Sequence, residues 1–127
     1  MVPFPRQGLS AEPAAPSGMS VPFDTFSQLD IRVGKVVEVE EMPQARKPMY
    51  RLRIEFGDGA PKQCVAGIKA SYTKEQLLGK IVVAVVNLQP KSVVGVVSEC
   101  MMLAAFDDGG ASLLSPDKEL PLGTKVG

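Results

Sequence analysis

Hydrophobic and polar residues alternate along much of the chain after residue 30, which is the pattern of a β-strand with one buried face. The stretch YRLRIEF is the clearest case, and its apolar residues share one face: Tyr50, Leu52, Ile54 and Phe56. A second stretch keeps the same period at Ile31, Val33, Val37 and Val39. Gly34 lies inside it, where a sharply bent strand needs a residue without a Cβ atom. Both stretches therefore predict strands.

Turn signals divide the rest of the chain into hairpins. The sequence GDG at 57–59 predicts a tight turn into a strand that begins with KQCVAG. Near the C-terminus, DDGG at 107–110 separates MMLAAF from ASLLS and predicts a second hairpin. Between these hairpins, the run KIVVAVVN at 80–87 is rich in β-branched residues and predicts a buried strand.

One short helix is expected between these strands. Thr73 and Gln76 have the spacing of a capping box, and Gly79 is placed to end the helix. Three strands, a short helix and two more strands is the order of elements in the OB-fold. We therefore predict an all-β protein with a five-stranded OB-fold barrel and a short helix between strands 3 and 4. The pattern on its own would also suit an SH3-like barrel.

The N-terminal segment differs from the rest of the chain in composition. Residues 1–22 hold five of the eleven prolines and few residues that could build a core. Because proline removes a backbone donor and favours extended geometry before it, we predict an extended or disordered arm over 1–22 and a folded domain over 23–127. No apolar run approaches the ~18 residues needed to cross a bilayer, and the start lacks the basic-then-apolar pattern of a secretory signal. We expect a cytoplasmic protein with no membrane segment.

Charge is distributed unevenly, although the formal net charge is zero. Residues 1–31 carry a net charge of −2, residues 32–97 carry +5, and residues 98–127 carry −3. This asymmetry permits a local positive patch in the middle of the chain.

Catalysis finds little support in the sequence. The chain has no histidine, which is the commonest general base. Cys64 and Cys100 lie in apolar surroundings without the spacing of a metal site, so we interpret them as reduced packing residues. Three acids near the end of a strand are interpreted as solubilising charge: Glu38, Glu40 and Glu41. We expect no enzyme activity, no metal and no cofactor.

Several motifs resemble the tRNA-binding domain family. They are DIRVGKV (30–36), YRLRIEFG (50–57), VAGI (65–68), NLQPKSVVGVVSE with MMLAA (87–105, apart from position 100) and LSPDKELPLGTKV (114–126). The family includes free-standing dimeric tRNA-binding proteins, the C-terminal domain or beta subunit of methionyl-tRNA synthetase, and CsaA-type secretion chaperones. The resemblance implies an OB-fold with extra C-terminal strands, a homodimer, and recognition of the shape of tRNA with little sequence preference.

The resemblance also implies RNA-binding residues, which match the family motifs by position: Lys35, Asn87, Lys91, Ser98 and Met101. Lys91 stands where most members have arginine, so it keeps the charge but loses the bidentate fork. Cys100 replaces the usual glycine of the motif that contains Ser98 and Met101.

Arg51 and Arg53 could add cations for phosphate, and amide or hydroxyl groups could add directional bonds. Each candidate also has a plainer interpretation. The two arginines would suit the solvated face of a strand, Asn87 an ordinary turn, and Lys35 plain surface. Of Met101 and its neighbour Met102, one is expected to face the core.

We therefore predict a homodimer that binds tRNA, either as an auxiliary partner of an aminoacyl-tRNA synthetase or in free form. The alternative is a CsaA-like chaperone that binds unfolded preproteins in an apolar groove near Tyr50, Val93 and Val94. The stretch ARKP favours this alternative, whereas Asn87 and Met101 favour tRNA.

Overall fold

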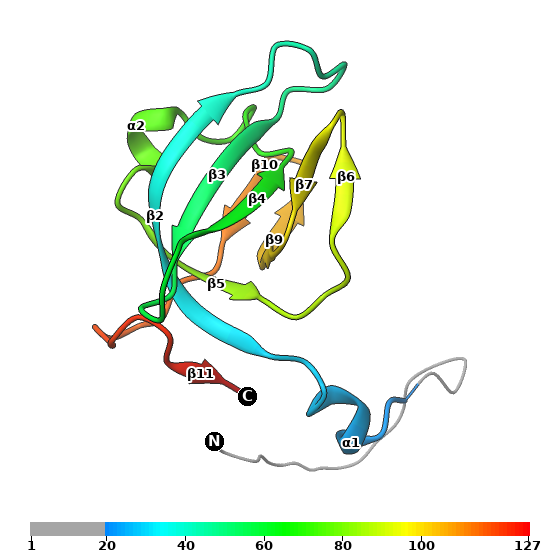
Figure 1. Cartoon of the computed structure of the whole chain (residues 1–127), viewed down its shortest axis with the longest axis vertical. Helices are drawn as coiled ribbons and strands as arrows, with labels where there is room; N and C mark the ends of the chain where they lie inside the picture. The colour runs from blue at the N-terminus through cyan, green and yellow to red at the C-terminus, as the bar shows by residue number, and fades with distance from the viewer. Residues whose placement is uncertain (1–19) are drawn as a thin grey trace.

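The computed structural model describes residues 20–127, so the predicted arm over 1–22 lies almost entirely outside the described residues. The described part is mostly β-structure with two short helices (Figure 1). Its elements are α1 (Phe23–Phe26), β2 (Ile31–Glu41), β3 (Tyr50–Glu55), β4 (Lys62–Ala66), α2 (Lys74–Leu77), β5 (Ile81–Val85), β6 (Lys91–Val93), β7 (Val96–Ser98), β8 (Met101–Met102), β9 (Ala104–Asp107), β10 (Gly110–Leu113) and β11 (Lys125–Val126). No helix among residues 20–127 has the length and apolar character needed to cross a membrane.

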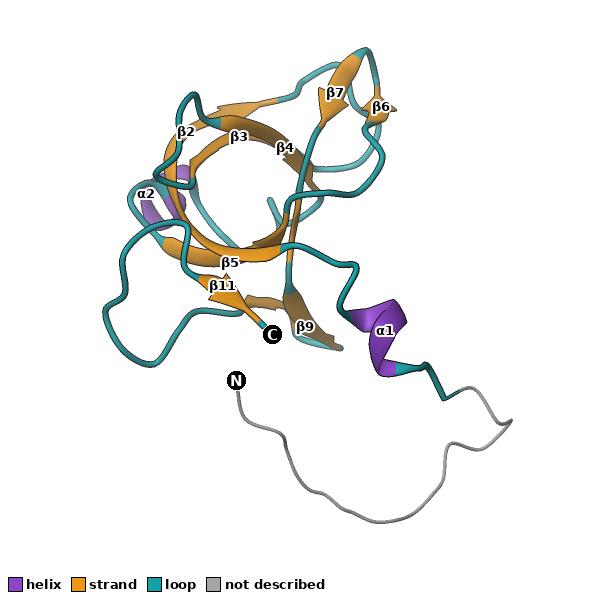
Figure 2. Cartoon of the chain, turned by 60° about the horizontal axis from the view of Figure 1, so that its bottom comes forward, coloured by secondary structure: helices purple, strands orange, loops and turns teal. Residues whose placement is uncertain are grey.

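Five antiparallel strands form the barrel in the order β4-β3-β2-β5-β8. Figure 2 shows β2, β3, β4 and β5 curving into a ring. The ring closes between β4 and residues 97–100, where the Glu99 N–H donates to the Gln63 carbonyl at 2.7 Å. Because α2 lies between the third and fourth barrel strands, the predicted OB-fold is confirmed.

The long strand β2 departs from the predicted alternation. Ile31, Val33 and Val39 are buried as expected, but Val36 is buried in place of Val37, which is exposed. The pairing of β2 with β3 shifts register between Val36 and Glu38. The bulge lies after Val36, so it does not cause the burial of Val36; it brings Val39 to the same face as Val36, in the barrel core. Ile31 lies on the opposite face of β2, in a second apolar cluster with Val83 and Val85. The prediction that Val37 is buried together with Val39 was therefore wrong.

Gly34 lies where β2 passes closest to the core. A Cβ atom at this position would lie 2.6 Å from a ring carbon of Phe56 and 2.7 Å from a methyl group of Ile54. Both neighbours are themselves buried, so they have little room to move. The requirement for glycine is therefore steric and comes from close packing against the core, whereas the sequence led us to expect a sharp bend.

The core fills the barrel interior with apolar side chains from all barrel strands, and Leu52, Ile54, Leu77 and Val82 are fully buried. Tyr50 belongs to this core, and its hydroxyl donates to the Tyr72 carbonyl at 2.9 Å. The short helix α2 contributes Leu77 and begins with the predicted capping box, in which Thr73 and Gln76 bond each other's backbone N–H groups.

The extra C-terminal strands attach outside the barrel. β9 and β10 form the predicted hairpin, with Gly110 opposite Asp107. β10 is held to the barrel because its Leu113 N–H donates to the Tyr72 hydroxyl at 2.9 Å. β11 pairs with the start of β2, with Lys125 opposite Arg32. The predicted additional strands are thereby confirmed.

We expect Gly34→Ala to lower the free energy of unfolding by about 2 kcal/mol, because the new methyl group overpacks a filled core. Gly67→Ala is the matched control, since a Cβ atom there would meet nothing nearer than 4.0 Å. Urea denaturation of both variants measures the difference. Equal stabilities would show that Phe56 and Ile54 yield without cost.

Candidate nucleic-acid interface

Arg51 and Arg53, two predicted phosphate-binding cations, project from β3 toward the acids of β2. Because Arg51 lies opposite Glu40 in the strand register and Arg53 opposite Glu38, each arginine meets a carboxylate. Arg51 pairs with Glu40, approaches Glu38 at 3.8 Å, and donates to the Gln63 side-chain oxygen at 2.9 Å. Arg53 pairs with Glu38 at 3.1 Å. The charges of both arginines are thus already compensated.

The acids of β2 form ion pairs. They therefore have a structural role in addition to the solubilising role expected from the sequence. The guanidinium of Arg51, as hydrogen-bond donor, lowers the pKa of Glu40 below its ordinary value. Glu41 likewise accepts from Lys69 at 2.7 Å, and this hydrogen bond lowers the pKa of Glu41. All three carboxylates at the end of β2 are therefore engaged.

Asn87 uses its side-chain amide to fix the entry to the barrel. Its oxygen accepts from the Asp30 N–H at 2.8 Å, and its nitrogen donates to the Gln28 carbonyl at 2.8 Å. One donor hydrogen and one lone pair remain for other partners. The residue holds the segment before β2 against the end of β5.

Ser98 takes part in barrel closure. Its hydroxyl accepts from the Val65 N–H at 3.0 Å and donates to the Cys100 carbonyl at 3.2 Å. Cys100 is buried, and its thiol faces that of Cys64. The hydrogen bond from the Cys100 thiol lowers the pKa of Cys64, whereas the pKa of Cys100 is raised by the same pairing and by burial. Both cysteines are free thiols packed in the core.

Lys91 lies on the exposed face of the β6–β7 hairpin, opposite Ser98. Among the residues that the structure describes, it forms no ion pair. The hairpin turns at Val94 and Gly95, which have φ angles of 52° and 81°. Two successive positive φ angles are typical of a type I′ turn, and a β-branched residue is strained there.

Met101 and Met102 divide as predicted, because Met102 is buried and Met101 is 49% exposed. Met101 pairs with Val85 on the neighbouring strand. Its exposed thioether lies on the outer side of the barrel seam, where it is accessible to a base or an apolar side chain.

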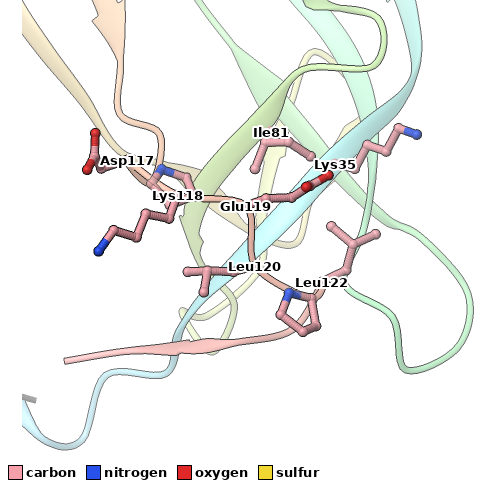
Figure 3. Close-up of a pocket in the computed structure, with 9 residues that line it drawn as sticks. Lys35, Ile81, Asp117, Lys118, Glu119, Leu120 and Leu122 are labelled. Carbon is pink, nitrogen blue, oxygen red and sulfur yellow. The ribbon is translucent and has the colours of Figure 1, made fainter.

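Lys35 lies beside a cavity of about 560 Å³ formed against the loop 116–122 (Figure 3). Its ammonium group points away from Asp117 and Glu119 in this view. Lys35 is opposite Ile81, the first residue of β5, whereas Asn87 lies two residues beyond Val85, the last residue of β5. Six residues of extended chain span ~20 Å. Lys35 is therefore set apart from the other candidates.

The structure thus pairs two of the predicted residues, Lys91 and Ser98, across the β6–β7 hairpin, with Asn87 before the hairpin and Met101 after it. It leaves the arginines of β3 in ion pairs and Lys35 at the far end of β5. Tyr50 cannot line the predicted peptide groove, because it is only 3% exposed and belongs to the core. Val94 of that groove is exposed and Val93 half-buried. Residues 20–127 contain no cluster of three or more side chains suited to hold a metal ion.

Residues 31–125 match the model of the tRNA binding domain family. Methionine–tRNA ligase of Pyrococcus abyssi is 47% identical over 108 residues, which are 85% of this chain and 15% of that protein. The chain thus spans about 15% of the length of the curated relatives it matches.

Solved structures agree with this sequence relationship. Chaperone CsaA of Bacillus anthracis is 43% identical with a TM-score of 0.80, and covers 85% of this chain and 99% of its own. A MetRS-related protein of Pyrococcus horikoshii is 31% identical with a TM-score of 0.76, and covers 84% and 97% respectively. The fold is that of a small OB-type β-barrel. The chain belongs to the tRNA-binding domain family.

Arg51→Ala is expected to raise the pKa of Glu40, because the mutation removes the guanidinium that stabilises the charged carboxylate. A folded-state pKa below the ordinary value means that the pair stabilises the protein above that value and loses its effect as the pH falls through the folded pKa. NMR titration of the Glu40 carboxyl in both proteins measures the shift. An unchanged titration would show that the pair does not persist in solution.

Val94→Asn is expected to raise the free energy of unfolding by about 1 kcal/mol, because asparagine tolerates a positive φ angle that strains valine. Val97→Asn is the control: Val97 is similarly exposed on the same hairpin, but its φ angle is not positive. Thermal or urea unfolding compares the two. A gain in both variants would attribute the effect to surface polarity and not to the turn.

Proposed function

We propose that this chain binds tRNA by its shape, as a homodimer, and acts as a non-catalytic auxiliary module for an aminoacyl-tRNA synthetase. The family match over residues 31–125 carries this proposal. The relationship to methionine–tRNA ligases makes a methionyl enzyme the first partner to test. Such a role belongs in the cytoplasm, where tRNA is charged.

The chemistry of the exposed segment supports RNA binding. Lys91 offers a cation that no described acid neutralises, and Met101 offers an exposed apolar surface for an unstacked base. Asn87 and Ser98 keep hydrogen-bonding capacity beyond the contacts they make within the barrel. Phosphate contacts fix the register of such a complex, whereas the folded shape of the RNA gives selectivity.

Dimerisation supplies what one barrel lacks. A chain of zero net charge offers no overall excess of positive charge, and two copies related by symmetry double the number of phosphate-binding cations across a longer footprint. Exposed apolar residues suit such a contact, above all Phe106 on the β9–β10 hairpin, which is 72% exposed.

A chaperone function is the second candidate. The similarity to chaperone CsaA favours it, as do the exposed apolar side chains near the seam: Val94, Val97 and Met101. In this alternative the hairpin would hold an extended, unfolded polypeptide by apolar contact. Binding would then depend weakly on salt.

Gel shifts with total tRNA across a salt series distinguish the two functions. We expect tRNA to bind, with affinity falling steeply as salt rises, and Lys35→Ala and Lys91→Ala each to reduce the slope of log affinity against log salt by about 1. Lys74→Ala, an exposed lysine on α2, is the control.

An unfolded preprotein serves as the competing ligand in the same assay. Binding of the preprotein without binding of tRNA at low salt would rule out tRNA binding and support the chaperone function. Light scattering on the purified chain tests the dimer separately, and a monomer that still binds tRNA would remove only the assembly from the proposal.

A further inference from the structure

Two cations lie close to the ion pairs of β3, at the end of the barrel where the loop 42–49 joins β2 to β3. The loop 42–49 between β2 and β3 carries Arg46 and Lys47, both exposed. Among residues 20–127, neither forms an ion pair or a side-chain hydrogen bond. The acids that precede the loop on β2 are Glu38, Glu40 and Glu41, which already pair with Arg51, Arg53 and Lys69. The pairs on the strands therefore leave the loop cations uncompensated.

The loop presents these cations on a constrained backbone. Met42 is buried at its start, and the Ala45 N–H donates to the Met42 carbonyl at 3.0 Å to form a turn. Pro43 and Pro48 restrict the chain on either side. A loop held in this way loses less conformational entropy when its side chains bind a ligand.

The loop and Lys91 lie at the same end of the barrel. A row of neighbours crosses the sheet from Arg51 to Val65 in the strand register, then to Ser98 by hydrogen bond and to Lys91 in the β6–β7 pairing. Three strand-to-strand steps of this kind span ~14 Å. Figure 1 shows the connection between β2 and β3 and the tip of the β6–β7 hairpin at this end, and Figure 2 also places them near each other.

We infer that Arg46, Lys47 and Lys91 form the phosphate-binding cluster of this protein, and that Arg51 and Arg53 serve to hold the strands beneath it. The inference rests on the proposed tRNA function and assigns its electrostatic contacts to the loop 42–49 and the β6–β7 hairpin. The ligand is the sugar-phosphate backbone of a folded RNA, which meets the adjacent charges of Arg46 and Lys47, the charge of Lys91 and the exposed apolar hairpin tip.

The different roles of the cations follow from competition between the carboxylates of β2 and a ligand phosphate for the same arginine side chains. A phosphate that approaches Arg51 must displace Glu40, Glu38 or Gln63, and the remaining carboxylates repel it. The side chain of Arg51 is also only 20% exposed. Arg46 and Lys47 need no such exchange, so the same phosphate gains their full attraction.

The test uses the full chain and total tRNA, with binding measured from low to moderate salt. Arg46→Ala/Lys47→Ala is expected to reduce the salt slope by about 2 and to weaken binding about tenfold or more at moderate salt. Lys62→Ala/Lys118→Ala is the matched control. It removes the same charge from the start of β4 and from the loop 114–124, outside the loop 42–49 and the β6–β7 hairpin, and should leave the slope close to that of the unaltered chain.

The outcomes separate this inference from the function on which it rests. Failure of the unaltered chain to bind tRNA in dilute buffer would overturn both. Normal binding that is weakened equally by the two double variants would overturn the loop cluster and leave the tRNA function standing. If the loop variant keeps its tRNA affinity but loses binding of an unfolded preprotein, the cluster recognises polypeptide and the inference is wrong. Circular dichroism of each variant confirms that both are folded.

Discussion

The closure of the barrel is the constraint on which the rest of the structure depends. It joins β4 to residues 97–100, and only one of its principal bonds is an ordinary backbone bond, from Glu99 to the Gln63 carbonyl. The others use side chains: Glu99 accepts from the Gln63 N–H, the Gln63 amide donates to the Val97 carbonyl, and Ser98 accepts from the Val65 N–H. Since a sheet edge left open exposes unpaired backbone groups, these side chains complete the fold.

This closure explains why several polar residues of the candidate interface have a structural role in the barrel as well as a proposed role in binding. Ser98 sits in the seam, and Asn87 holds the entry to β2, so each spends part of its hydrogen-bonding capacity on the barrel itself. Gln63 links the seam to Arg51 and hence to the ion pairs of β2 and β3. The polar network therefore holds β4 to the β6–β7 hairpin that carries Lys91, and the cations on the hairpin and the loop remain available to a ligand.

Most of the fold could be predicted because its signals are local. The alternation over 50–56, the β-branched run at 80–87 and the capping box at Thr73 each record a local structural preference, and each is confirmed. The bulge after Val36 could not be predicted in this way, because it depends on how β2 pairs with β3 and leaves no mark in the hydrophobic period of β2 alone. The same pairing decides that Arg51 meets Glu40, so the compensation of the β3 arginines was equally out of reach. Tyr50 is the reverse case: the alternation already placed it with Leu52 and Ile54, which is inconsistent with a place in an exposed groove.

The distribution of cations limits the kind of ligand this surface can select. Lys35 lies five residues before Glu40 on β2, and Glu40 is opposite Arg51, from which three strand-to-strand steps lead to Lys91. No compact anion can therefore contact Lys35 and Lys91 together. A ligand that uses both must be extended, carry repeated negative charge and follow the curvature of the barrel. A folded polynucleotide meets all three requirements, and a peptide of mixed composition lacks the regular charge. Because the chain as a whole is neutral, long-range attraction is weak, and in the proposed complex selectivity would depend on short-range contacts to phosphates spaced along the RNA. The proposed recognition of tRNA by shape, with little sequence preference, is consistent with such an arrangement.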